Sequence, residues 1–174
     1  MTYRIDNGIP EKQLKIWLQN AAKKFGTFND GRVDYTKADI APIVMCTVMH
    51  ADKMLLVKRG YGLADAEGYW STINGFIDEI KPVKKQAQQE IQEELGLDVS
   101  VETIHVADSY TLSNPKEKRA YIVFPCLVEL TKLPVIKLNQ ENTDSVWIAR
   151  AELETYHILD DLPVAIDAAL AITS

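Results

Sequence analysis

The sequence predicts an α/β protein in which helices cover both faces of a central mixed β-sheet, an α/β/α sandwich. Strand-like and helix-like segments are interleaved along the chain, and neighbouring strand-like runs are joined by short turns typical of hairpins. One segment, residues 82–95, has a clear helical periodicity. The length of 174 residues suits one main domain that buries roughly two-thirds of its unfolded surface.

The N-terminal part is predicted to form a helix followed by two strands. Residues 10–25 repeat apolar side chains at helical spacing, with lysines on the other positions. Residues 40–50 and 54–58 are strand-like and are separated by a short turn, so we expect a β-hairpin. We interpret residues 1–39 as a helical extension that packs on the main domain, which comprises residues 40–174.

The segment at residues 82–95 is the most strongly predicted helix. A proline is favourable at its start, and the following glycine, Gly96, is typical of a helix end. Its apolar stripe consists of Val83, Ala87, Ile91 and Leu95. Further strands are predicted over residues 99–112, 120–130 and 145–148, and short helices over residues 151–156 and 162–172.

Composition excludes several classes of function. The net charge of −6 argues against binding to a nucleic-acid polymer, which needs clustered Lys and Arg. No apolar run approaches the ~18 residues of a membrane span, and the first residues lack the layout of a secretory signal. We therefore expect a cytoplasmic protein without a membrane partner. Cys46 and Cys126 lie in apolar strand-like runs, where reduced, buried thiols are expected.

Three carboxylates on the predicted helix indicate a metal site. At 100° per residue, Glu90, Glu93 and Glu94 fall within an arc of roughly 100° beside the apolar stripe. Like charges at this spacing destabilise a bare helix, and oxygen-only ligands suit Mg²⁺ or Mn²⁺. The pattern alone is weak, because glutamate-rich helix faces are common.

The surrounding residues make the pattern specific. The stretch from Gly75 to Leu97 resembles the signature of the Nudix family, Gly-x5-Glu-x7-Arg-Glu-aliphatic-x-Glu-Glu-x-Gly-aliphatic. The matching positions are Gly75, Glu90, Ile91, Glu93, Glu94, Gly96 and Leu97. The resemblance extends over residues 40–170, and residues 1–39 lie outside it.

The resemblance implies a Nudix-like α/β/α fold and metal-dependent cleavage of a diphosphate linkage. Glu90, Glu93 and Glu94 then hold Mg²⁺ or Mn²⁺, and the Asn74 backbone carbonyl is a further ligand. A general base is also required. The resemblance favours Glu141 for this role, while Asp144, Glu90 and a purely structural role for Glu141 stay open.

Two positions depart from the family signature. Its first glutamate is Lys81 in this chain, and its arginine is Gln89. In the family these two residues pair and brace the loop against the helix. Their replacement leaves a Lys81–Gln89 hydrogen bond as the expected substitute, and it keeps open the alternative of a binding-only protein that has lost turnover.

Several other side chains are candidates for substrate binding. Lys58 and Arg59 end a predicted strand and could meet phosphates, Lys81 lies in the signature loop, and Trp70 could stack on a base. For other candidates the structural reading competes with or outweighs a ligand role. These are Tyr61, Tyr69, Asp78, Glu79, Tyr110, Lys116, Lys118 and Arg119, and no catalytic role is assigned to His50, His105 or His157.

The main functional hypothesis is hydrolysis of a nucleoside-diphosphate-linked compound: a nucleotide sugar, a dinucleotide or a nucleoside triphosphate. An isopentenyl-diphosphate isomerase is the less favoured enzyme alternative, because the residues around Trp70 offer neither the cysteine nor the histidine typical of that site. We expect a small-molecule partner and, as a default, a homodimer.

Overall fold

The computed structural model describes residues 4–60, 67–113 and 119–173. Its central feature is a twisted mixed sheet with the strand order β1-β7-β8-β2-β3-β4, to which β5, β6 and β9 attach at β2, β8 and β3. The strands are β1 (Arg4–Asn7), β2 (Ile40–His50), β3 (Lys53–Arg59), β4 (Trp70–Ser71), β5 (Ile73–Phe76), β6 (Ile104–Val106), β7 (Tyr110–Ser113), β8 (Ala120–Leu130) and β9 (Asn142–Ala149). Only the pairing of β2 with β8 is parallel among these strands, so the predicted mixed sheet is confirmed.

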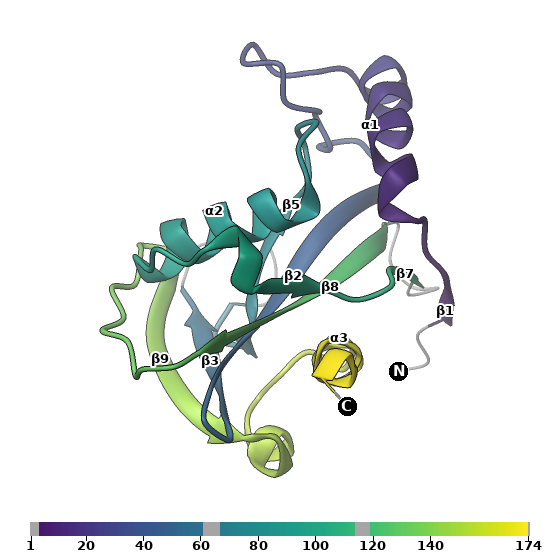
Figure 1. Ribbon diagram of the computed structural model, residues 1–174. Coiled ribbons are helices and arrows are strands. Elements are labelled where there is room, and N and C mark those ends of the chain that lie inside the picture. The colour runs from purple at the N-terminus through teal and green to yellow at the C-terminus, as the bar shows by residue number, and fades with distance from the viewer. Residues whose placement is uncertain (1–3, 61–66, 114–118, 174) are drawn as a thin grey trace.

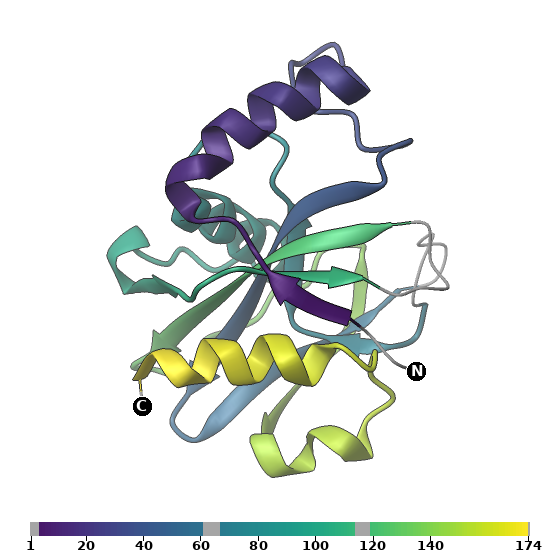
Figure 2. The ribbon, with the colours of Figure 1, turned by 90° about the vertical axis from the view of Figure 1, so that its right-hand side faces the viewer.

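Helices lie on both faces of this sheet. They are α1 (Glu11–Phe25), α2 (Val83–Leu95) and α3 (Leu162–Leu170), with 3₁₀ turns at Val101–Thr103, Arg150–Thr155 and Ala171–Thr173. Figure 1 shows α2 and α1 on one side of the strands and α3 on the other, and Figure 2 shows the sheet between α1 and α3 from a second direction. The predicted α/β/α sandwich is therefore confirmed.

Two apolar clusters fill the spaces between these layers. The first joins the inner faces of α1 and α2 to the sheet and includes Leu18 and Ile91. The second lies under α3 and includes Leu56 and Ile166. Because Leu18 and Ile91 belong to one buried cluster, the N-terminal helix shares the core that supports α2. Among the described residues, no helix has the length and apolar character needed to cross a membrane.

The local signals for α2 and for the β2–β3 hairpin are confirmed. Pro82 precedes the helix, and Gly96 follows it at a φ of 66°, the left-handed conformation that glycine adopts without strain. His50 pairs with Lys53, which leaves a two-residue turn. The cysteines are free and fully buried, as expected, and the hydrogen bond with Cys126 raises the pKa of Cys46 together with burial.

The continuous strand predicted over residues 99–112 is wrong. The chain forms a 3₁₀ turn, then β6 and β7 as separate strands on β8. The interruption falls where the N-terminal segment crosses: the N–H of Gly8 donates to the Ser109 carbonyl at 3.1 Å, and the Ser109 hydroxyl donates to the Ile9 carbonyl at 2.6 Å. The segment that follows β1 thus bonds to Ser109 at the point where one continuous strand was predicted. The β1 strand itself was not predicted.

Candidate active site

A polar cleft of about 370 Å³ lies beside α2. It collects most of the residues that the sequence predicted as functional, from β5, from α2, from the loop that leads into α2, from the end of β3 and from the turn into β9. The predicted residues that line it are Arg59, Asn74, Lys81, Glu90, Glu93, Glu94 and Glu141. Its volume lies within the ~300–1,000 Å³ range of small-molecule sites.

Glu94 is the most deeply placed carboxylate in the cleft. The residue is 6% exposed, and it accepts hydrogen bonds from Asn142 Nδ2 at 2.8 Å and from the Asn74 backbone N–H at 3.3 Å. Burial raises its pKa to about 8, with a further contribution from the nearby charge of Glu90, although the bond from Asn142 opposes the shift. The fold therefore holds a carboxylate where the ionised form lacks full solvation.

Glu90 extends from α2 toward β5, where its carboxylate lies between Gln86 and Gly75. Gln86, one turn earlier on the helix, donates from Nε2 to Glu90 Oε1 at 2.5 Å. On the other side, a Cβ atom added to Gly75 would lie 2.0 Å from Glu90 Oε1, so only a glycine lets the strand pass this close. Burial raises the pKa of Glu90 to about 7. This contact gives a physical reason for pairing Gly75 with Glu90 in the signature.

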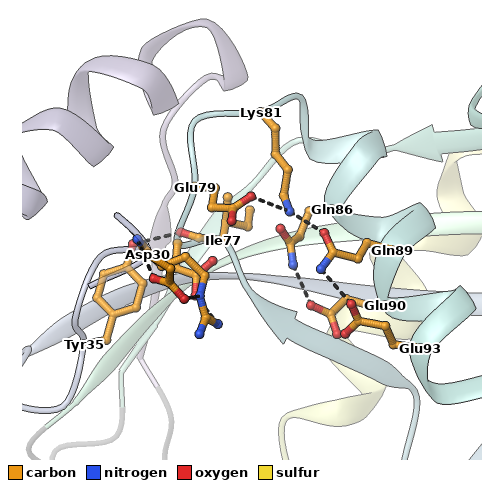
Figure 3. A network of polar contacts seen from close by, with 11 residues as sticks. Asp30, Tyr35, Ile77, Glu79, Lys81, Gln86, Gln89, Glu90 and Glu93 are labelled. Atoms are coloured by element: carbon orange, nitrogen blue, oxygen red, sulfur yellow. Dashed lines mark hydrogen bonds and ion pairs between the residues drawn. The ribbon is translucent and has the colours of Figure 1, made fainter. Parts of the chain in front are cut away.

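Glu93 is exposed, and a chain of polar contacts holds its carboxylate. Gln89 Nε2 donates to Glu93 Oε1 at 2.7 Å, while Gln89 Oε1 accepts from Lys81 Nζ at 2.5 Å. Lys81 also pairs with Glu79 at 3.1 Å. Figure 3 shows this chain running from the loop at Glu79 and Lys81 to Gln89 and Glu93 on the helix. The Lys81–Gln89 hydrogen bond expected from the sequence is thus present.

The donor set of the cleft fits a hard divalent cation. Burial raises the pKa of both Glu90 and Glu94, and a neighbouring carboxylate adds to each shift: Glu93 for Glu90, and Glu90 for Glu94. Gln86 is 3% exposed and its Oε1 has no hydrogen-bond partner among the described residues. A cation with oxygen ligands relieves these features. In the described part of the chain, no group of three acidic, histidine or cysteine side chains already has ligand spacing, so all three glutamates can share one ion only if their side chains move.

The remaining predicted catalytic residues differ in placement. The Glu141 side chain is exposed at the cleft, and its charge contributes to the raised pKa values of Glu90 and Glu94. Asp144 lies on β9, accepts from the Ser145 N–H at 2.8 Å, and does not line the cleft. The position favours Glu141 over Asp144 as a general base. The Asn74 carbonyl as a ligand stays a prediction.

Two predicted substrate-binding residues do not line the cleft. Lys58 and Trp70 face each other across β3 and β4, with the ammonium group 5.9 Å from the ring centroid. The Trp70 ring also packs edge-on against Tyr156 at 5.4 Å. Both side chains therefore have a packing role, and their contact with substrate stays a prediction.

Among the weaker candidates that the structure describes, Arg119 and Tyr69 make structural contacts. Arg119 donates from Nη2 to the Tyr35 carbonyl at 2.7 Å, and Tyr69 stacks on His157 with ring centroids 3.8 Å apart. Burial raises the pKa of Tyr110. Tyr61, Lys116 and Lys118 lie outside the described residues. Asp78 and Glu79 line the cleft.

Four lining residues were not singled out from the sequence. Gln86 precedes Glu90 by four residues, so helical spacing could have revealed it. Asn142, Arg32 and Phe76 gave no such signal, because their places in the cleft depend on contacts between distant segments. Asn142 is 7% exposed, and its hydrogen bond to Glu94, at 2.8 Å, is shorter than the bond from the Asn74 N–H, at 3.3 Å.

Comparison with known proteins identifies the class to which this fold and site belong. The family model of the NUDIX domain matches residues 39–166. The chain therefore belongs to the Nudix family, and its class is that of the Nudix pyrophosphohydrolases. No curated protein matches the sequence.

Solved structures of Nudix proteins share the fold. A MutT NUDIX hydrolase from Burkholderia pseudomallei has a TM-score of 0.62 and 18% identity, with 74% of this chain and 97% of that chain covered. The NUDIX domain of Shewanella oneidensis NrtR, complexed with ADP ribose, has a TM-score of 0.64 and 16% identity, with 77% and 88% covered. A bifunctional NMN adenylyltransferase/ADP ribose pyrophosphatase from Francisella tularensis, complexed with AMP and a Mn ion, has a TM-score of 0.62 and 17% identity, with 94% and 48% covered.

Proposed function

We propose that this protein is a divalent-metal-dependent hydrolase that cleaves the diphosphate linkage of a nucleoside-diphosphate-linked compound. The substrate classes are nucleotide sugars, dinucleotides and nucleoside triphosphates. The observation that carries the proposal is the pair of neighbouring carboxylates in the polar cleft, the buried Glu94 and the half-buried Glu90, each held by a neutral amide. A purely structural role gives no reason to bury two acids together without a cation beside them.

The residues of the cleft divide the work of binding and catalysis. Glu90, Glu93 and Glu94 hold Mg²⁺ or Mn²⁺. A cation bound there screens phosphate charge and lowers the pKa of a water molecule. Glu141 accepts a proton from the attacking water, and Arg59, at the end of β3 beside the turn into β9, binds substrate phosphate. Asn142 and Gln86 fix the orientation of Glu94 and Glu90 through their amide N–H groups.

The contacts of Lys81 support a bracing role, and its contact with substrate stays a prediction. Its ammonium group already contacts Gln89 and Glu79. We assign Lys81 the role of bracing the signature loop, with the Lys81–Gln89 bond in place of the family's Glu–Arg pair.

An activity screen tests the proposal. Purified protein is incubated with ADP-ribose, UDP-glucose, a dinucleoside tetraphosphate and the nucleoside triphosphates, with Mg²⁺, Mn²⁺ or EDTA. We expect a nucleoside phosphate to be released from at least one class with metal and none with EDTA. Tight binding of these compounds without turnover, for wild type and under every metal condition, would instead support the binding-only alternative. A cytoplasmic location and a homodimer stay predictions.

A further inference from the structure

Arg32 lines the cleft from outside the region that the family model matches. It lies between α1 and β2, whereas the other described lining residues fall between Arg59 and Asn142. We propose that Arg32 is a substrate-binding residue whose guanidinium group binds a phosphate of the diphosphate substrate. This inference rests on the proposed function, and it adds a phosphate contact supplied by the N-terminal extension.

A tight turn positions the backbone of Arg32. The Phe28 N–H donates to the Arg32 carbonyl at 2.8 Å, and the Gly31 N–H donates to the Phe28 carbonyl at 3.0 Å. Gly31 has a φ of 91°, which side chains with a Cβ rarely adopt. The next residue, Val33, donates its N–H to the Asp78 carbonyl at 2.9 Å, which joins the turn to the loop before α2. Arg32 is therefore in place before a ligand binds.

Two acidic residues orient the side chain of Arg32 without using all of its N–H donors. Its Nε donates to Asp30 Oδ2 at 2.9 Å, and its Nη1 makes a long contact of 3.4 Å with Asp78 Oδ2. Nη2 has no hydrogen bond to any residue that the structure describes, and the side chain is 47% exposed. Because a guanidinium group has five N–H donors in a planar fork, the two N–H groups of Nη2 and the second N–H of Nη1 remain to bind phosphate oxygens.

The acidic side chains of α2 explain why a phosphate would need a cation at Arg32. Glu90, Glu93 and Glu94 all project from α2, so the α2 wall repels a polyanion wherever a cation does not screen it. Figure 3 shows Asp30, the ion-pair partner of Arg32, apart from Glu90 and Glu93. A phosphate that extends away from the α2 wall needs a cation of its own, and Arg32, which keeps N–H donors beyond those paired with Asp30 and Asp78, supplies one.

The competing explanation is that Arg32 only braces the turn through Asp30 and Asp78. Arg32→Gln and Arg32→Lys separate the two explanations, with Arg150→Gln as the matched control. Arg150 makes a comparable surface ion pair, to Asp167 at 2.7 Å, but does not line the cleft. The measurements are kcat and KM on the best substrate of the activity screen, the melting temperature, and calorimetric binding of α,β-methylene-ADP, whose bridging carbon resists hydrolysis.

Loss of a charge-assisted phosphate contact should raise KM about 10–100-fold for Arg32→Gln, with kcat within about 3-fold of wild type. Binding of α,β-methylene-ADP should weaken by a similar factor, Arg32→Lys should recover part of it, and Arg150→Gln should change neither. An unchanged KM and analogue affinity in Arg32→Gln at a native melting temperature would overturn the inference. If wild type hydrolyses nothing, the proposed function fails, and analogue binding by the same variants still decides the role of Arg32.

Discussion

The substitution Glu94→Gln should stabilise the metal-free protein at high pH. Burial raises the folded-state pKa of Glu94 from 4.5 to about 8. Because the folded protein binds this proton more tightly than the unfolded chain, protonation of Glu94 stabilises the fold. This stabilisation is complete below about pH 4.5 and is lost as the pH rises through about 8. At roughly 1.4 kcal/mol per pKa unit, ionised Glu94 lowers the free energy of unfolding by on the order of 4–5 kcal/mol at pH 9.

The gain from glutamine is smaller than this amount. Glutamine keeps the volume and can still accept from Asn142, but its NH₂ group then faces the Asn74 N–H, which now lies 3.3 Å from Glu94 Oε1. Losing that weak bond costs about 1 kcal/mol. We therefore expect Glu94→Gln to raise the free energy of unfolding by about 3–4 kcal/mol at pH 9, and to lower it by about 1 kcal/mol at pH 4.5, where only the lost bond from the Asn74 N–H counts.

Urea denaturation in EDTA, followed by circular dichroism at both pH values, measures this difference. Glu129→Gln, the same chemical change at an exposed position on β8, is the control and should have no effect at either pH. The same Glu94→Gln protein should lose at least about 100-fold in turnover with Mg²⁺, because the metal supplies several kcal/mol to catalysis. Equal stability of wild type and Glu94→Gln at pH 9 would refute the burial argument, and undiminished turnover would show that α2 is not the active site.

Three further predictions follow from the same cleft. Gly75→Ala should displace the Glu90 carboxylate, since the new Cβ would lie 2.0 Å from its Oε1, and should lower kcat/KM by about 100-fold while the protein stays folded, as kinetics and circular dichroism will test. Mg²⁺ or Mn²⁺ should raise the melting temperature more at pH 8.5 than at pH 5.5, because Glu90 and Glu94, with pKa values of about 7 and 8, are protonated at the lower pH; equal shifts at both pH values would contradict binding through these two residues. In a double-mutant cycle, Lys81→Glu with Gln89→Arg should be more stable and more active than either single change; lost activity despite favourable stability coupling would instead indicate that Lys81 contacts substrate, and near-zero effects throughout would show that neither role holds.

Local signals predicted those elements whose formation depends on their own residues. The α2 helix has a start, an apolar stripe and a glycine end within its own sequence, and β8 matches the predicted residues 120–130. By contrast, the break between β6 and β7 depends on Ser109 contacting the N-terminal segment, a hundred residues away in sequence. The β1 strand has no buried residue to give it an apolar pattern, so only its pairing with β7 defines it.

The same distinction applies to the candidate site. Glu90, Glu93 and Glu94 could be predicted because helical geometry fixes their relative directions. The Lys81–Gln89 bond could be predicted because the resemblance specified which two positions meet. What the sequence could not give is how unequally the carboxylates are placed, with Glu94 buried and Glu93 exposed, because burial depends on β5 and on the turn into β9.

The N-terminal extension shows why a sequence boundary need not be a boundary of the site. Family resemblance begins near residue 40, yet the Arg32 turn is joined through Val33 to the Asp78 carbonyl, and Tyr35 donates its hydroxyl to the Ile77 carbonyl at 2.8 Å. The loop that carries Lys81 into α2 is thus supported from outside the matched region. Because α1 shares its buried cluster with α2, residues 4–39 influence both the wall of the cleft and the position of the signature loop.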